Sequence, residues 1–228
     1  PQVVLACALQ TPQLLASSTL IPSPQWLPLH ALRGQAQVLP APLWPALCAL
    51  RQPWMGSGYV LSLPEAAVRQ LHPAADPMDT DWLLIGATFE SADSPLAPEQ
   101  AWVHNRAGLA ALTTDPPAPG HMTALRHLVG TRAASADRLP YCGTMADLRP
   151  LLAEPQRWAG KHLHELPRMP GLAVCAGMGS RGLTLAALLA DYLAARIEGT
   201  PLPIETDLAD GLDPARIALR RLRQGDIG

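Results

Sequence analysis

A glycine-rich segment near the C-terminal end carries the clearest chemical signal in the sequence. It lies between the apolar run 172–176 and a long apolar stretch, and consists of Gly177, Met178, Gly179, Ser180, Arg181, Gly182 and Leu183. The spacing G-x-G-x-x-G between a strand and a helix is typical of anion sites, because glycines let a ligand approach the backbone and the helix N-terminus presents free N–H groups. Ser180 and Arg181 add further donors. We predict ligand binding; the alternative is a tight turn in which the glycines only satisfy geometry.

The position of this loop argues against the opening of a dinucleotide-binding domain. Such a domain continues with further βαβ units, and an acidic residue follows about 20 positions on, at the end of the next strand. Glu205 and Asp207 lie at a tolerable distance, but no apolar strand leads to them, and Gly228 is the last residue. We therefore expect the loop to bind an anionic group in another role.

Arg132 is the second candidate, because it ends the apolar run 128–131. An arginine at a strand end can hold a carboxylate through two parallel hydrogen bonds. On sequence alone we favour the alternative, a local ion pair with Asp137. Tyr59 could line a pocket, although a core tyrosine is the commoner outcome.

The remaining polar candidates are weaker. Arg33 precedes Gly34 and could enter a cleft, but a surface strand with a bulge explains the pattern equally well. His162 and His164 would share one face of a strand, yet their charged and proline-rich surroundings indicate an exposed loop. The spacing of the histidines supports no Ser/His/Asp or Cys/His arrangement.

The composition describes a folded protein without a strong electrostatic field. Hydrophobic residues make up 48% of 228 residues, and the formal net charge is −2. This charge gives no global attraction for nucleic acid or anionic membranes. The only local concentration of positive charge lies in the last thirteen residues, at Arg216, Arg220, Arg221 and Arg223.

The cysteines and the hydropathy favour a reducing, cytoplasmic setting. No metal-ligand spacing connects the four cysteines, and each lies in or beside an apolar run, so we expect buried free thiols rather than a metal site. They are Cys7, Cys48, Cys142 and Cys175. No apolar run in the sequence is long enough to span a membrane, and its first residues do not show the basic-then-apolar pattern of a signal peptide, so we expect neither a membrane span nor a secretory route.

Hydrophobic periodicity predicts an α/β protein with mixed sheets. We expect strands at 3–8, 32–39, 58–63, 82–89, 128–133 and 172–176, and helices at 98–112, 148–158 and 182–197. We also expect a short helix or loop at 11–20 and an acidic loop at 76–81. The first and last strands are of the buried, parallel type, whereas the middle of the chain is typical of an antiparallel sheet. This order predicts three segments of a two-domain enzyme, at 1–24, 25–133 and 134–228.

Two motifs together resemble a known family. The run 128–132, followed by Asp137-Arg138-Leu139-Pro140 and Gly143, resembles the G-x-R…D-x-L-P-x-x-G stretch of FAD-dependent amine oxidases related to D-amino-acid oxidase. The loop from Gly177 to Leu183 is similar to the L-G-S-R-G-L loop in the oxidase half of the bifunctional tRNA-modifying enzymes of 5-methylaminomethyl-2-thiouridine biosynthesis. The resemblance covers essentially the whole chain.

The resemblance implies that this is the C-terminal portion of a two-domain flavoprotein. Residues 25–133 would form the substrate domain, and 134–228 the returning strand–helix part of the FAD domain. The family's N-terminal FAD fingerprint and its methyltransferase half are absent, and both are expected in the same polypeptide. Two features depart from the family. This chain has Asp213-Pro214-Ala215-Arg216 where family members carry Asn-Pro-Asn-Arg, and residues 49–57 look like an insertion relative to the family.

The resemblance also implies a reaction. The cofactor would be FAD, with residues 177–183 at the flavin ring and Arg132 holding a substrate carboxylate, helped by Tyr59 and Arg181. The substrate would be carboxymethylaminomethyl-(2-thio)uridine at the tRNA wobble position, and the products aminomethyl-uridine and glyoxylate. The alternative is an oxidase of a free amine or amino acid such as glycine or sarcosine. A third, non-enzymatic interpretation is that the fragment alone binds no FAD and is inactive.

Overall fold

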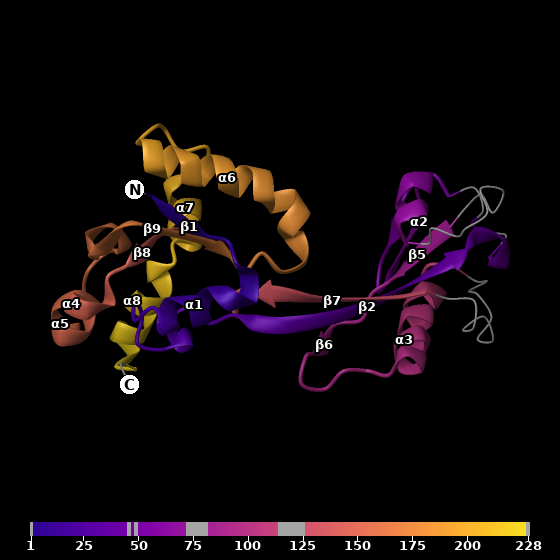
Figure 1. The fold of residues 1–228 in the computed structure, drawn as a ribbon, viewed down its shortest axis with the longest axis horizontal. Coiled ribbons are helices and arrows are strands. Elements are labelled where there is room, and N and C mark those ends of the chain that lie inside the picture. Colours follow the sequence, from indigo (N-terminus) through magenta and orange to yellow (C-terminus); the bar gives the residue numbers. More distant parts are fainter. Residues whose placement is uncertain (1, 45–46, 48–49, 72–81, 114–125, 227–228) are drawn as a thin grey trace. The chain divides into compact units, whose positions relative to one another are not determined.

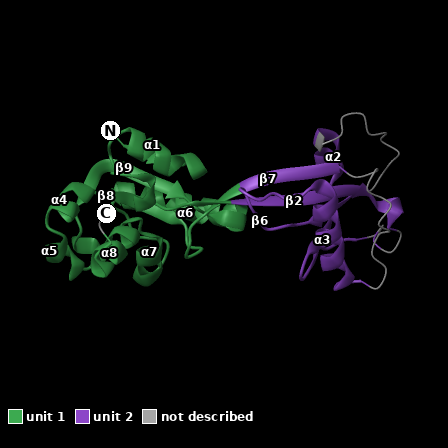
Figure 2. Cartoon of the chain, turned by 90° about the horizontal axis from the view of Figure 1, so that it is seen from below, with its two compact units in different colours: residues 1–31, 132–228 green, residues 32–131 purple. Residues whose placement is uncertain are grey.

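The computed structural model describes residues 2–44, 47, 50–71, 82–113 and 126–226. The chain forms two compact units (Figure 2). Unit 1 comprises residues 1–31 and 132–228, and unit 2 comprises residues 32–131. Strands β2 and β7 run through the boundaries between the units.

Unit 1 contains a small sheet and most of the helices (Figure 1). Its elements are β1 (Val3–Leu5), η1 (Ala8–Gln10), α1 (Thr11–Ser17), η2 (Pro24–Trp26), β8 (Tyr141–Ala146), α4 (Leu148–Ala153), α5 (Pro155–Ala159), η6 (Leu163–Glu165), β9 (Arg168–Ala176), η7 (Gly179–Arg181), α6 (Gly182–Glu198), α7 (Thr206–Leu212) and α8 (Ala215–Gln224).

The sheet of unit 1 has the strand order β1-β9-β8, with β1 parallel and β8 antiparallel to β9. Side chains alternate between its two faces, as the pleat of a strand requires. Cys142 and Ala173 pack with Leu189 and Tyr192 of α6 on one face. On the other face, Tyr141, Met145 and Val174 pack with residues of α1, α4 and α8. The sheet is therefore covered by helices on both sides.

Helix α6 follows from local signals in the sequence. Its apolar residues include Leu189, Tyr192 and Leu193, whose spacing places them on one buried stripe. It ends at Gly199, which adopts a left-handed φ of 72°, and Thr200 N donates to Ala195 O at 3.0 Å. A glycine in this conformation is the usual C-terminal stop of a helix.

Unit 2 contains a larger antiparallel sheet with two helices. Its elements are β2 (His30–Pro40), η3 (Ala41–Leu43), β3 (Trp54–Met55), β4 (Tyr59–Leu63), α2 (Glu65–Leu71), β5 (Trp82–Gly86), β6 (Glu90–Ser91), α3 (Pro98–Ala110) and β7 (Arg126–Ala134). The order is β3-β4-β5-β2-β6, and β7 pairs with β2. Leu83 and Ile85 pack with Trp102 and Leu109 of α3, whereas Trp82 packs with Val68 of α2, so both faces are covered.

Several predicted elements differ from those observed. The strand predicted at 3–8 ends at Leu5, and it is not buried: Val3 and Val4 are 52% and 42% exposed. Among the described residues, β1 is an edge strand with β9 as its neighbour. The helix predicted at 148–158 is two helices, since Pro155 cannot donate the backbone hydrogen bond that a continuous helix needs. The acidic loop predicted at 76–81 lies outside the described residues.

The α/β class is confirmed by the mixture of helices with parallel and antiparallel strands. The prediction of buried thiols is confirmed for Cys142 and wrong for Cys7, which is exposed just beyond the end of β1. Cys175 is only half-buried, and Cys48 lies outside the described residues. Within the described part of the chain, no helix has the length and apolar character needed to cross a bilayer.

Candidate functional site

The glycine loop connects β9 to α6 through a tight turn that needs two of its glycines. Gly177 has a φ of +79° and Gly179 a φ of +59°, which are conformations that residues with a side chain rarely adopt. A Cβ atom on Gly177 would also lie 2.9 Å from the Cδ2 atom of Leu29. Both positions are therefore fixed by the fold, as the tight-turn interpretation expects.

Gly182 and Leu183 have a different character. Gly182 has an ordinary helical conformation, and a Cβ atom placed on it would meet no atom within 4 Å. Leu183 is 101% exposed although it is a large apolar residue, and Ser180 is exposed beside it. The α-helix that begins here is 17 residues long and has no side-chain cap at its N-terminus. Its first-turn N–H groups and the positive end of its dipole are thus suited to an anionic or carbonyl ligand.

The loop is joined to the end of strand β7, which carries Arg132. Met178 forms an antiparallel bridge with Ala134, and a Cβ atom on Gly179 would lie 3.7 Å from that of Ala134. Arg132 lies two residues before Ala134 in β7, about 7 Å along the strand and on the same side of it. The Arg132 side chain is half-buried, with its Nη1 atom shielded from solvent. The structure therefore brings together two candidates that the sequence separates.

Arg181 supports the turn that follows β7. Its Nη2 atom donates to the backbone oxygen of Arg138, which has a left-handed φ of 61°. Left-handed conformations are uncommon for a residue with a side chain, so the contact helps to hold an unusual turn. Arg181 thus has a structural partner in addition to its predicted contact with substrate.

Asp137, in the same turn, has a cation that sequence proximity does not suggest. The Nε atom of Arg216 in α8 lies 3.0 Å from Asp137 Oδ2, and Ser135 Oγ donates to Asp137 Oδ1 at 2.8 Å. Burial raises the pKa of Asp137, but the hydrogen bonds from Arg216, Ser135 and the Leu139 amide outweigh it and lower the pKa to about 2. The ion pair fastens the turn beside the glycine loop to α8.

Most of the C-terminal arginine cluster makes contacts within unit 1. Besides Arg216, Arg221 lies over the Trp26 ring at 4.2 Å and pairs with Asp226, and Arg223 donates to Ala159 O and Lys161 O. These three arginines hold α8 in place. RNA binding needs a basic track. In this cluster, Arg216 and Arg221 are paired with carboxylates, and Arg223 is bound to backbone oxygens.

Tyr59 lies in β4 of unit 2, half-buried. Its ring occupies the space beside Gly86 of β5: a Cβ atom on Gly86 would lie 2.5 Å from the Tyr59 hydroxyl oxygen. This close approach explains why residue 86 is a glycine. The role of Tyr59 in substrate binding stays a prediction.

Arg33 belongs to a buried polar network in unit 2. Its Nη1 atom lies 2.9 Å from Glu90 Oε2, and Thr88 Oγ1 donates to Glu90 Oε1 at 2.6 Å. Gln35 Nε2 donates to Leu96 O at 2.8 Å, and the backbone N–H of Leu96 donates to Glu90. Arg33 therefore stabilises the sheet through its ion pair with Glu90, and its place in a cleft stays a prediction.

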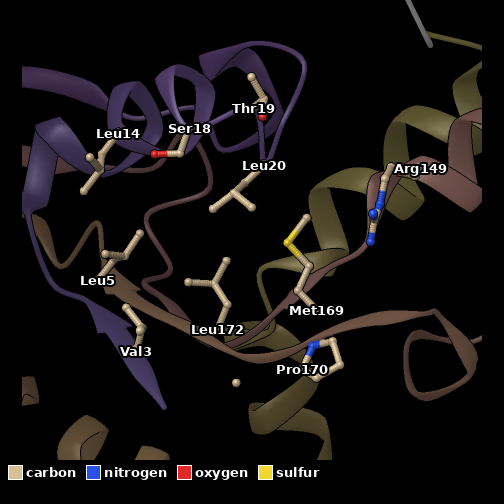
Figure 3. Close-up of a pocket in the computed structure, with 11 residues that line it drawn as sticks. Val3, Leu5, Leu14, Ser18, Thr19, Leu20, Arg149, Met169, Pro170 and Leu172 are labelled. Atoms are coloured by element: carbon tan, nitrogen blue, oxygen red, sulfur yellow. The ribbon is translucent and has the colours of Figure 1, made fainter. Parts of the chain in front are cut away.

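The other polar and hollow features of unit 1 do not include the predicted site residues. His162 and His164 stack with ring centroids 5.7 Å apart at the start of η6, and no cluster of three or more potential metal ligands occurs among the described residues. A hollow of about 650 Å³ lies beside β1 (Figure 3), where Leu5, Leu14, Leu20 and Leu172 surround it. It is mainly apolar and separate from the glycine loop.

Comparison with known proteins gives the family. The family model described as "DAO: FAD dependent oxidoreductase" matches residues 1–196. The chain belongs to this FAD-dependent oxidoreductase family. This confirms the resemblance to the oxidases related to D-amino-acid oxidase.

Relatives and solved structures refine this assignment. The chain is 38% and 36% identical to the tRNA 5-methylaminomethyl-2-thiouridine biosynthesis bifunctional proteins MnmC of Cupriavidus necator and Cupriavidus metallidurans, over 100% and 99% of its length. It spans only 32% and 31% of those proteins. Its fold is similar to that of iminodiacetate oxidase from Chelativorans sp. BNC1 (TM-score 0.52, 21% identity, 90% of this chain and 44% of that one). Glycine oxidase from Geobacillus kaustophilus gives a TM-score of 0.54 at 18% identity, over 90% and 43% of the two chains.

The residues of the glycine loop fit one part of the family's cofactor. An uncapped helix N-terminus suits the electron-rich edge of a flavin ring, and the open space at Gly182 leaves room for a flat ring system beside the backbone. The exposed side chain of Leu183 is available for an apolar contact with such a ring. Sequence reasoning identifies this loop from its glycines, but it misses the ion pair between Asp137 and Arg216, because their positions differ by 79 residues.

Proposed function

We propose that the polypeptide carrying this chain is an FAD-dependent oxidase acting on the CH–NH group of carboxymethylaminomethyl-(2-thio)uridine at the tRNA wobble position. The products would be aminomethyl-uridine and glyoxylate. The observation that carries the proposal is the bridge between Met178 and Ala134, which joins the glycine loop to the strand that carries Arg132. The likeness to MnmC proteins over the full chain supports the substrate class.

The glycine loop would hold the flavin ring, with Gly179 to Leu183 as the contacting residues. When bound, FAD would accept the hydride from the carbon beside the substrate nitrogen. The first-turn N–H groups of α6 and about half a positive charge from its dipole would stabilise the negative charge that develops next to them. Leu183 would exclude water from that contact. These groups are in place before any ligand arrives, so no reorganisation is needed.

Arg132 would hold the carboxylate of the glycine-like arm of the substrate. A guanidinium can bind a carboxylate through two parallel hydrogen bonds, which fix its direction as well as its position. Partial burial of Arg132 strengthens such a pair, since fewer water molecules compete for it. Arg181 would act mainly by positioning the turn at Arg138, which it contacts directly.

The proposal for Arg132 is tested by its replacement with alanine in the full polypeptide. Arg132→Ala should raise the apparent KM for the modified tRNA roughly a hundredfold, which corresponds to about 3 kcal/mol for a charge-assisted contact, while FAD stays bound. Arg126→Ala, at the exposed opposite end of β7, is the matched control for loss of one positive charge. If Arg132→Ala and Arg126→Ala raise the apparent KM equally, Arg132 does not hold the substrate carboxylate.

The alternative is an oxidase of a free amine or amino acid such as glycine or sarcosine. The fold likeness to iminodiacetate and glycine oxidases is consistent with it, and Arg132 could hold any glycine-like carboxylate. Glyoxylate released from modified tRNA, but not from free glycine, supports the first function. Release from glycine alone supports the second, and release from neither contradicts both.

Binding of tRNA needs basic surface beyond the C-terminal cluster. Because Arg216, Arg221 and Arg223 make contacts within unit 1, we propose that the RNA contacts lie mainly elsewhere in the longer polypeptide. The MnmC relatives are named as bifunctional, and we propose that a methyltransferase part accompanies this oxidase part. A tRNA substrate would place the enzyme in the cytoplasm.

A further inference from the structure

Two thiols face each other across strands β8 and β9. Cys142 and Cys175 are direct partners in the antiparallel register, and their Sγ atoms are 3.8 Å apart. Cα atoms of directly opposed residues lie about 4.5–5.5 Å apart in such a pair. A disulfide needs a separation of about 4.4–6.8 Å between Cα atoms. Rotation of the two side chains can therefore bring the sulfurs to bonding distance without moving the strands.

The two thiols differ in their access to solvent. Cys142 is fully buried under α6, with its Sγ atom 3.5 Å from Leu189 O. Cys175 is only half-buried, and it lies one residue beyond Val174, the last residue of β9 that pairs with β1. A dissolved reagent therefore meets Cys175 first.

The contact between the sulfurs also makes them chemically unequal. The hydrogen bond from the Cys142 thiol lowers the pKa of Cys175, although burial opposes this. The same hydrogen bond, together with burial, raises the pKa of Cys142. Since the thiolate is the reactive form, Cys175 is the nucleophile of the pair.

We propose that Cys142 and Cys175 are a thiol modification site, at which a peroxide oxidises the pair to a disulfide linking β8 and β9. The Cys175 thiolate attacks one oxygen of the peroxide; an S–O bond forms, the O–O bond breaks, and with hydrogen peroxide the departing oxygen leaves as water after taking up a proton. The Cys142 sulfur then attacks the sulfenic acid of Cys175. An S–S bond forms, the S–O bond breaks, and a second water leaves. Two thiols lose two electrons, and one peroxide is reduced to two waters.

The site lies directly before the glycine loop. Cys175 is two residues from Gly177, and bond formation would draw the Cys142 sulfur away from its contact with Leu189 in α6. The disulfide would thus fix the end of β9 from which the loop starts. The proposal concerns the thiols alone and does not depend on the proposed oxidase function.

The test uses the full chain with Cys7→Ser and Cys48→Ser, which leaves only the proposed pair. Hydrogen peroxide should remove both remaining free thiols together and make the protein lighter by two hydrogen masses. Digestion with trypsin should then yield peptides 139–157 and 169–181 linked to each other, and dithiothreitol should separate them. The same linked peptides should appear in the wild-type chain, which guards against an effect of the serine substitutions on folding.

Single substitutions separate the two roles. With Cys142→Ser, Cys175 should stop at the sulfenic acid and be labelled by dimedone; with Cys175→Ser, Cys142 should stay reduced at the same peroxide concentration. The proposal is overturned if peroxide leaves both thiols free in the folded chain, if only links between two chains form, or if Cys142 is the thiol that reacts first.

Discussion

The ion pair between Asp137 and Arg216 should contribute measurably to the stability of unit 1. The pKa of Asp137 is lowered from 3.8 to about 2, which corresponds to about 2.5 kcal/mol between its two protonation states. Because the Asp137 side chain is 27% exposed, solvent screening reduces the expected contribution to about 1–2 kcal/mol. Asp137→Asn should lower the free energy of unfolding at neutral pH by this amount, as measured by urea denaturation of the full chain.

The same pair predicts a pH dependence of definite sign. A carboxyl whose pKa is lowered in the folded state stabilises the protein above its unfolded pKa of 3.8, and this contribution is lost as the pH falls toward 2. The difference between wild type and Asp137→Asn should therefore be constant near neutral pH and shrink below about pH 4. Glu154→Gln is the matched control, because Glu154 and Arg157 are also 3.0 Å apart but are 58% and 63% exposed. The reasoning is refuted if Asp137→Asn and Glu154→Gln lower the free energy of unfolding equally. It is also refuted if the difference between wild type and Asp137→Asn does not change with pH.

Three further predictions follow from single positions. Gly177→Ala should lower the free energy of unfolding by about 1–3 kcal/mol, since residue 177 has a positive φ and a close contact. Gly182→Ala should not lower stability, because residue 182 has a helical conformation and open space, but it should reduce the retained flavin. Equal flavin content in wild type and Gly182→Ala would contradict the assignment of the loop to the flavin. Arg168→Ala should cost about 3–5 kcal/mol in urea denaturation, because it leaves the buried Asp213 carboxylate, 2.7 Å away, without its cation; a cost below about 1 kcal/mol would refute this. Glu90→Gln should destabilise the chain at neutral pH and less so in acid. Burial raises the pKa of Glu90, but hydrogen bonds from Thr88, Leu96 and Gln35 outweigh it and hold the pKa below its usual value. The stabilisation by the charged carboxylate is therefore lost as the pH falls. The measurement is the thermal unfolding temperature of wild type and Glu90→Gln as a function of pH. A difference between the two proteins that stays constant with pH would contradict the prediction.

Local signals in the sequence predict the glycine loop and its helix closely. The helix expected at 182–197 is observed as Gly182–Glu198, because a glycine-rich start, an apolar stripe and a terminal glycine all act within the segment itself. The helix expected at 98–112 is likewise found as Pro98–Ala110. These features need no knowledge of distant residues.

Features that depend on pairing between distant segments could not be predicted. Strand β8 escapes prediction because its short mixture of polar and apolar residues becomes a strand only when it pairs with β9. The cation observed beside Asp137 is Arg216 in α8, which proximity in sequence does not suggest. The facing thiols of Cys142 and Cys175 depend on the same strand register. Sequence spacing therefore identifies the loop, and the sheet decides which candidates lie beside it.

Anaerobic reduction of the bound flavin tests most directly whether the polypeptide oxidises the modified wobble uridine of tRNA. The full polypeptide, purified with its flavin, is mixed with tRNA that carries carboxymethylaminomethyl-uridine, and the visible flavin absorbance is followed in a single turnover. We expect rapid loss of this absorbance with the modified tRNA, none with unmodified tRNA, and slow or no loss with glycine or sarcosine. Flavin that stays oxidised with the modified tRNA, or that is reduced only by a free amino acid, would contradict the proposed function.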